Sequence, residues 1–280
     1  MVKTAIVTDT TAFLDQDMIK TFNVYEVPLS VIFDGKAYRE GIDMTAAAFY
    51  EKLETEQALP TTSQPPVGAF VSLFEQLKED GYTDVVSVHL SSKISGTYQT
   101  AMSAARMVEG LTVHGFDSEI SSAPQAFFVQ TAAEMVRDGA DATHIIATLQ
   151  QLKEKACAYF MVDDLNHLRR GGRLSGAQAL IGGLLQIKPI LHFEDGTIVP
   201  FEKVRTEKKA LNRILSMLYA DIDAGKVTRV AVIHANRPDR AEALKQEIEA
   251  YNKTLEIRTG YFSPVIGTHL GVGSLGIGWH

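Results

Sequence analysis

The feature that most constrains this fold is the alternation of strand-like and helix-like segments along the first 156 residues. Short apolar runs repeatedly precede longer stretches whose apolar residues recur at helical spacing. This alternation is typical of a mostly parallel sheet with helices on its faces, because each parallel strand needs a long crossover to reach the next. It predicts strands at residues 4–8, 24–33, 83–89 and 111–116, and helices at 46–54, 67–80, 96–108, 125–138 and 143–155.

Two hairpin signals interrupt this pattern. Asp34-Gly35 follows the strand-like run at 24–33, and Glu194-Asp195-Gly196 separates strand-like runs at 187–193 and 198–204. Both predict a β-hairpin, because an Asp-Gly pair readily adopts the positive φ angles of tight hairpin turns.

The second half departs from strict alternation. Apolar residues recur at helical spacing over 208–220, which predicts an amphipathic helix. We therefore expect two domains, an N-terminal α/β domain at residues 1–156 and a C-terminal α/β domain with a hairpin at 157–280. The other expected elements are strands at 159–162, 229–234 and 255–261, helices at 174–185 and 240–251, and a Gly-rich, strand-like segment at 265–279.

Charge and cysteine content narrow the function classes. The 280 residues include 34 acidic and 27 basic ones, a net charge of −7, whereas a dedicated nucleic-acid binder usually has a basic face. No apolar run approaches the ~20 residues of a transmembrane helix, and the first residues lack the pattern of a secretory signal. Cys157 is the single cysteine, and the histidines show no metal-ligand pairing. We expect a cytoplasmic protein with no nucleic-acid partner, metal or cofactor.

The first candidate site is the segment 91–97, which lies between a predicted strand and a predicted helix. A helix N-terminus offers unpaired N–H groups and a positive dipole end, so it suits an anion. Ser95 adds a hydroxyl, and Gly96 allows a ligand to approach the backbone closely. The alternative is that Ser95 only caps the helix.

The second candidate is Thr61-Thr62-Ser63-Gln64-Pro65-Pro66, which also precedes a predicted helix. Its hydroxyls could hold a ligand, and its prolines suit the start of a helix. Capping together with a rigid turn is the favoured explanation when this segment is considered alone. Two hydroxyl-rich helix starts in one half of the chain favour an anion site.

Two further candidates lie in the second half. His269 stands among glycines in the segment 267–273, where backbone could pack closely around a ligand; the alternative is a structural histidine in a strand. The segment 167–175 holds three arginines in five residues, a pattern that favours contact with a phosphate or a partner. A solvated basic turn is the alternative for that run.

The common nucleotide and hydrolase motifs are missing from the sequence. It holds no GxxxxGK[ST] P-loop, no GxGxxG after the first strand and no GxSxG turn. A hydrolase or acyl transferase with Ser95 as nucleophile and His269 as base stays open, although the sequence identifies no acidic residue to orient the histidine.

Six segments, in this order, make the chain resemble the DegV family of bacterial proteins, whose characterised members are FakB-type fatty-acid-binding proteins. Together the segments span nearly the whole chain. The sequence departs from the family at Lys93, where glycine is common, and at Gly271-Val272-Gly273, where Gly-Pro-Gly is common. The matching segments are Asp9-Thr10, Thr62-Ser63-Gln64-Pro65, SSKISGTYQ at 91–99, LRRGGRLS at 168–175, Val204-Arg205-Thr206 and VIGTHLGVG at 265–273.

The resemblance implies a two-domain α/β fold with a fatty acid buried between the domains. In such proteins hydroxyls of the TSxP and SGT motifs hold the carboxylate, with the histidine of the GTH motif nearby. The matching ligand-binding positions here are Thr62, Ser95, Gly96 through its N–H, and His269. The apolar segments 179–185 and 127–129 are candidate cavity walls, with ordinary core as the alternative.

The resemblance also implies a carrier function. FakB-type proteins present the carboxylate of a bound fatty acid to an ATP-dependent FakA-type kinase, and the acyl phosphate enters phospholipid synthesis. Arg170, Arg173 and Arg205 match basic positions near the ligand exit and the partner-docking surface. The resemblance therefore implies a non-enzymatic lipid-binding subunit for a fatty acid of about C14–C18. Each buried methylene of such a ligand would add ~0.8 kcal/mol to binding. Transient membrane contact and a regulatory lipid sensor without a kinase partner stay open.

Overall fold

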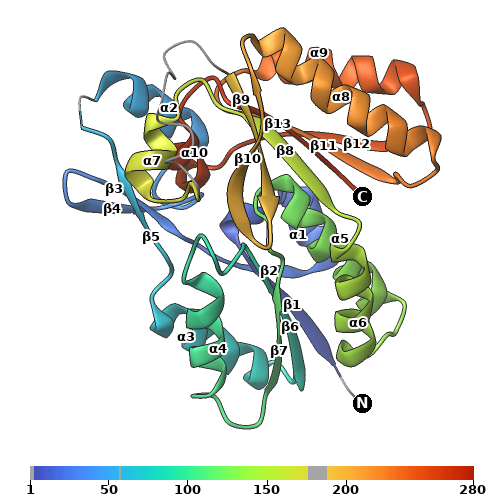
Figure 1. The fold of residues 1–280 in the computed structure, drawn as a ribbon. Helices are drawn as coiled ribbons and strands as arrows, with labels where there is room; N and C mark the ends of the chain where they lie inside the picture. Colours follow the sequence, from blue (N-terminus) through green and yellow to red (C-terminus); the bar gives the residue numbers. More distant parts are fainter. Residues whose placement is uncertain (1–2, 57, 176–187) are drawn as a thin grey trace.

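The computed structural model describes residues 3–56, 58–175 and 188–280. One of its layers is a four-stranded parallel sheet in the order β2-β1-β6-β7. Helices α3 and α4 cover one face of this sheet, and α5 and α6 cover the other (Figure 1). These elements are β1 (Thr4–Asp9), β2 (Val24–Val27), β6 (Asp84–His89), β7 (Thr112–Asp117), α3 (Val67–Glu79), α4 (Thr97–Ala105), α5 (Ala123–Arg137) and α6 (Ala142–Lys153).

Strand β1 shows why the first half folds in this way. Ile6 packs in the core beneath α5 and α6, whereas Ala5 and Val7 pack in the core beneath α3 and α4. Successive side chains of a strand point to opposite faces, so an unbroken apolar run is buried on both sides. The expected sheet with helices on its faces is confirmed.

The region 24–33, expected to form one strand, forms two strands in different sheets. Pro28 follows the last residue of β2, and because proline has no N–H to donate, a strand tends to end there. The chain resumes as β3 (Ser30–Phe33), which pairs antiparallel with β4 (Lys36–Arg39) and β5 (Thr61–Ser63) in a small separate sheet.

The larger second sheet has the order β10-β9-β8-β13-β11-β12. Leu211, Ile214 and Leu218 of α8 pack in one core with Val230 and Val232 of β11, so the predicted amphipathic helix is confirmed. Helices α8 and α9 cover the outer face of this sheet (Figure 1). The elements are β8 (Cys157–Met161), β9 (Lys188–Glu194), β10 (Thr197–Val204), α8 (Glu207–Asp223), β11 (Arg229–His234), α9 (Pro238–Tyr251), β12 (Glu256–Tyr261) and β13 (Leu275–Trp279).

Both predicted hairpins are confirmed. The turn residues Asp34 and Gly35 have φ angles of 48° and 78°, and Asp195 and Gly196 have 48° and 79°. The β9–β10 hairpin extends toward the four-stranded sheet (Figure 1). At its tip the Ser91 hydroxyl donates to the Gly196 carbonyl at 2.6 Å, so this hairpin bridges the two halves of the chain.

The strand expected over 265–279 is wrong in its first part. The chain forms a helix, α10 (Pro264–Leu270), and then strand β13. Proline suits the first turn of a helix because its missing N–H would have no partner there, and Gly271 ends α10 with a φ of 76°. Most of the helix expected at 174–185 lies outside the described residues, and Leu174 pairs with Ile198 in an isolated β-bridge.

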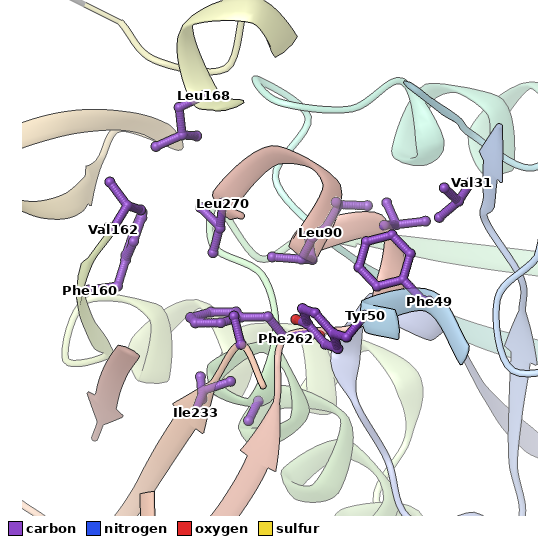
Figure 2. Close-up of a cluster of buried hydrophobic side chains, with 14 of the residues drawn as sticks. Val31, Phe49, Tyr50, Leu90, Phe160, Val162, Leu168, Ile233, Phe262 and Leu270 are labelled. Atoms are coloured by element: carbon purple, nitrogen blue, oxygen red, sulfur yellow. The ribbon is translucent and has the colours of Figure 1, made fainter. Parts of the chain in front are cut away.

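One buried apolar cluster joins the two halves of the chain (Figure 2). Val31, Phe49 and Leu90 come from the first half, and Phe160 and Phe262 come from the second. The four- and three-stranded sheets use strands that precede residue 157, and the six-stranded sheet uses later ones. A domain boundary at 156/157 stays a prediction, because the small sheet shares its core with the second half. The remaining short elements are the 3₁₀ turn η1 (Thr10–Ala12), α1 (Gln16–Phe22), α2 (Ala46–Thr55) and α7 (Asn166–Gly171).

Candidate functional site

An apolar cavity lies between the two halves of the chain. Most of the side chains that line it are apolar, and a few polar ones stand among them, as is typical of small-molecule sites. Leu29 and Leu90 line it from the first half, and Phe160, Ile233 and Phe262 line it from the second. A ligand in this space would therefore contact both halves of the molecule.

Thr62 and His269 meet at the wall of this cavity. Thr62 lies in β5 and His269 near the end of α10, and the Thr62 Oγ1 and His269 Nε2 atoms are 2.9 Å apart. The Nδ1 atom of His269 is buried and has no hydrogen-bond partner among the described residues. It lies against Gly171, where a Cβ atom would collide with the ring. The glycine therefore allows the histidine to occupy this place.

Ser95 and Gly96 lie in the same wall, at the start of α4. The Ser95 hydroxyl is 2.9 Å from that of Thr97, and Gly96 is the N-cap of α4. Gln64 packs so closely on Gly96 that a Cβ atom there would collide with its amide, and Gln64 Nε2 donates to Thr100 Oγ1 at 2.6 Å. These contacts hold the two hydroxyl-rich segments together.

Arg173 supplies a positive charge at this end of the cavity. Its Nε donates to the Ile94 carbonyl at 3.1 Å, and its guanidinium also donates to the Gly171 carbonyl. Arg173 lines the cavity together with Thr62, Ser95 and His269, and these two hydrogen bonds hold its guanidinium in place. A cation and two hydroxyls at one end of an apolar cavity match a ligand with one anionic group on an apolar body.

The other two candidate arginines lie elsewhere. Arg170 in α7 and Arg205 after β10 are both exposed, and neither lines the cavity formed by the described residues. The structure therefore separates Arg173, within the cavity wall, from two arginines on the surface.

Comparison with known proteins supplies the family. A family model described as an uncharacterised protein of the DegV family matches residues 3–280. The chain belongs to the DegV family. A DegV domain-containing protein of Halalkalibacterium halodurans is 53% identical over 280 residues, which cover 100% of this chain and 99% of that relative.

Solved structures of similar proteins share the fold described above. The crystal structure of Bacillus subtilis DegV, described as a fatty acid binding protein, has a TM-score of 0.94 and 48% identity and covers 100% of this chain and 99% of that one. A stearic-acid-binding protein from Eubacterium ventriosum has a TM-score of 0.90 and 26% identity and covers 100% of this chain and 98% of that one. The expected DegV-type α/β fold is confirmed.

The geometry of this DegV-family site does not support a Ser95–His269 nucleophile–base pair. Ser95 Oγ lies beside Thr97, whereas His269 Nε2 lies beside Thr62. No carboxylate of the described residues orients the histidine, because its Nδ1 atom is unpartnered. In addition, no group of three or more His, Cys, Asp or Glu residues in the described ranges could hold a metal ion.

The expected cavity walls need a correction. Residues 127–129 are buried in α5 but do not line the cavity that contains Thr62 and His269, so they belong to the ordinary core. Residues 179–185 lie outside the described residues. Ser121 and Ser122, which no sequence motif marks, line the cavity just before α5. No helix in the described ranges is both long and apolar enough to cross a membrane.

Glu40 is a further residue that the sequence did not reveal. It is 4% exposed, and its Oε2 accepts a hydrogen bond from the Val265 N–H at 2.7 Å. That N–H belongs to the first turn of α10, where helical N–H groups lack partners within the helix. Glu40 therefore positions the helix that carries His269. Burial raises the pKa of the Glu40 carboxyl group.

Acidification from pH 6.5 to 4 is expected to destabilise the protein through His269. Burial, followed by the charges of Arg173 and His167, lowers the pKa of His269 from 6.5 to about 4. Between these pH values the unfolded chain binds a proton that the folded histidine does not. The contribution of His269 to the free energy of unfolding is therefore fully present above pH 6.5, and it is lost as the pH falls toward 4. The expected loss is about 3 kcal/mol, measurable by denaturant unfolding at several pH values.

The comparison with His269→Gln isolates this effect. Burial, together with Asp9 and Glu40, raises the pKa of Glu26 from 4.5 to about 7, which changes stability in the opposite direction over that range. Glu26 is present in both proteins, so the difference between their two pH curves reports on His269. Parallel curves for the two proteins would contradict the assignment.

Proposed function

We propose that this protein binds a long-chain fatty acid, with the acyl chain in the apolar cavity and the carboxylate at Thr62, Ser95 and His269. The observation that carries the proposal is that one end of an apolar cavity holds hydroxyls, a neutral histidine and the cation of Arg173. The relatives described as fatty-acid-binding proteins support it.

The acyl chain and the carboxylate of such a ligand contribute differently to the binding free energy. Each buried methylene contributes ~0.8 kcal/mol, so a chain of about 14 methylenes offers roughly 11 kcal/mol. Association costs about 4–15 kcal/mol in lost freedom and ordering. The acyl chain therefore supplies most of the affinity, and the polar end avoids the cost of a buried, unpaired carboxylate.

We further propose that the protein is the carrier of a fatty acid kinase system, in which a FakA-type kinase phosphorylates the bound carboxylate. The sequence holds no P-loop, which agrees with a carrier that relies on its partner for ATP. Arg170 and Arg205 are exposed and are available to contact that partner. A role beside an ATP-dependent enzyme places the carrier in the cytoplasm, with transient contact to the membrane that receives its product.

Native mass spectrometry of the purified protein tests the binding proposal. One added mass per chain that matches a fatty acid is expected, and denaturation should release it. Ser95→Ala is expected to raise Kd by about 2- to 13-fold, since one hydrogen bond contributes ~0.5–1.5 kcal/mol. Ser103→Ala, an exposed serine of α4, is the matched control and should leave Kd unchanged. No bound lipid, and no uptake after incubation with fatty acids, would contradict the proposal.

The same preparation, incubated with the kinase and ATP, tests the carrier role. Arg205→Ala is expected to slow acyl-phosphate formation while the Kd for the fatty acid stays unchanged, because Arg205 lies on the surface outside the described cavity wall. An equal loss of binding and transfer would refute a partner-docking role for Arg205.

A further inference from the structure

Strand β13 carries two glycines on one face. Gly276 and Gly278 alternate with Leu275, Ile277 and Trp279, which pack in the core beneath α8 and α9. Alternate residues of a strand point to opposite faces, so both glycines face the inner side of the sheet. Neither glycine has a φ in the left-handed region. Glycine weakens a strand, and the backbone conformation here does not require it. The two glycines are therefore explained by the lack of room for a side chain on this face of the strand.

The two glycines make room for different neighbours. At Gly278 a Cβ atom would collide with the Pro124 ring, so this glycine allows the first turn of α5 to pack directly on the strand. At Gly276 a Cβ atom would lie 3.1 Å from Phe262 Cζ and 3.2 Å from Phe160 Cβ. Gly276, Phe160 and Phe262 all line the apolar cavity.

The sheet register places Gly276 within the cavity floor. Gly276 pairs with Phe160 of β8 on one side and with Ile233 of β11 on the other, and both of these residues line the cavity. Figure 2 shows Ile233 on a strand of the six-stranded sheet, Phe262 close to it, and Leu168 attached to α7 across the cluster. The missing side chain at Gly276 therefore lets Phe160 and Phe262 lie close against the cavity floor, and a side chain at this position would displace them within the cavity wall.

We infer that Gly276 is a specificity-determining residue that sets which acyl chains the cavity admits. This inference rests on the proposed function. The polar groups that face the carboxylate come from other elements, namely β5, α10, the start of α4 and Arg173. A side chain at position 276 therefore meets the acyl chain and not the carboxylate. The loss of affinity that it causes grows with the length of the acyl chain that extends past the cavity floor.

The experiment measures Kd for saturated fatty acids from C10 to C18 with the wild type, Gly276→Ala and Gly276→Val. Wild-type binding should tighten by up to about fourfold per methylene. Gly276→Val is expected to weaken C18 binding by at least about tenfold and C10 binding by less than about threefold, with Gly276→Ala between valine and wild type. Gly68→Ala is the matched control, because Gly68 is exposed in α3 and a Cβ there meets no described atom within 4 Å.

The outcomes separate the inference from the proposed function. Equal weakening at all chain lengths, or no weakening in either variant, would overturn the role of Gly276 while fatty acid binding by the wild type stands. A wild type that binds no fatty acid of any length would overturn the proposed function itself. If the valine variant fails to fold, as judged by circular dichroism, the smaller alanine substitution still provides the length dependence.

Discussion

Replacing Asp9 with alanine is expected to destabilise the protein by about 3–5 kcal/mol, because it removes a buried, multiply bonded carboxylate. Asp9 is fully buried at the end of β1. Its Oδ1 accepts from the Thr11 N–H at 3.1 Å, and its Oδ2 accepts from the Leu90 N–H and lies 3.0 Å from His89 Nδ1. The alanine variant leaves these buried groups unpaired, each at a cost of ~1–3 kcal/mol.

Chemical denaturation provides the measurement, with two comparison variants. Asp9→Asn keeps the shape and one oxygen acceptor, so it should cost less than Asp9→Ala. Asp138→Ala removes a carboxylate whose side chain is 74% exposed and should change stability by less than about 0.5 kcal/mol. A loss below about 1.5 kcal/mol in Asp9→Ala, half the lower bound expected for breaking a buried pair, would show that the chain rearranges around the site.

This network also links the fold to the candidate site. The Leu90 N–H that donates to Asp9 begins the loop that carries Ser95 and Gly96 to the cavity. The end of β1 and the start of this loop are neighbours because β1 and β6 pair in parallel, which places their carboxyl ends at one edge of the sheet. Open α/β sheets bind ligands at such an edge.

The local part of the site could be predicted from the sequence. Thr62 lies in the short strand β5, which the sequence did not predict, but Ser95 and Gly96 lie between a strand and a helix, as expected. Short-range rules of capping and turn formation suffice for such segments. The resemblance to a known family predicted that His269 lies near these hydroxyl groups. In the structure the Thr62 Oγ1 and His269 Nε2 atoms are 2.9 Å apart.

The long-range part of the site could not be predicted from the sequence. Glu40 and Val265 are 225 residues apart, and no local pattern marks a carboxylate that caps a distant helix. The helix α10 was expected as a strand, because its proline, glycine and β-branched residues have low helix propensity, and its largely buried position stabilises it instead. Likewise, a run of arginines does not indicate that Arg173 faces the cavity while Arg170 is exposed.

Arg173→Ala is expected to raise the Kd for a long-chain fatty acid by about 13- to 160-fold. The physical reason is that a charge-assisted hydrogen bond to a buried carboxylate contributes ~1.5–3 kcal/mol, and 1.4 kcal/mol corresponds to a factor of ten. Arg173 is the cation in the wall formed by Thr62, Ser95 and His269. In the ligand-free protein the pKa of His269 is lowered to about 4, so the histidine adds no positive charge to this wall at neutral pH before a ligand binds.

A fatty acid methyl ester provides the decisive control, because it keeps the acyl chain and removes the charge. Arg173→Ala should change the Kd of the ester by less than about threefold, so the coupling between the arginine and the carboxylate is the ratio of the two effects. Arg173→Lys, which retains a positive charge but loses the planar fork, should lie between wild type and alanine. If the acid and its ester lose affinity equally in Arg173→Ala, then Arg173 acts through its bonds to the Ile94 and Gly171 carbonyls, as a support for the cavity wall rather than as the partner of the carboxylate.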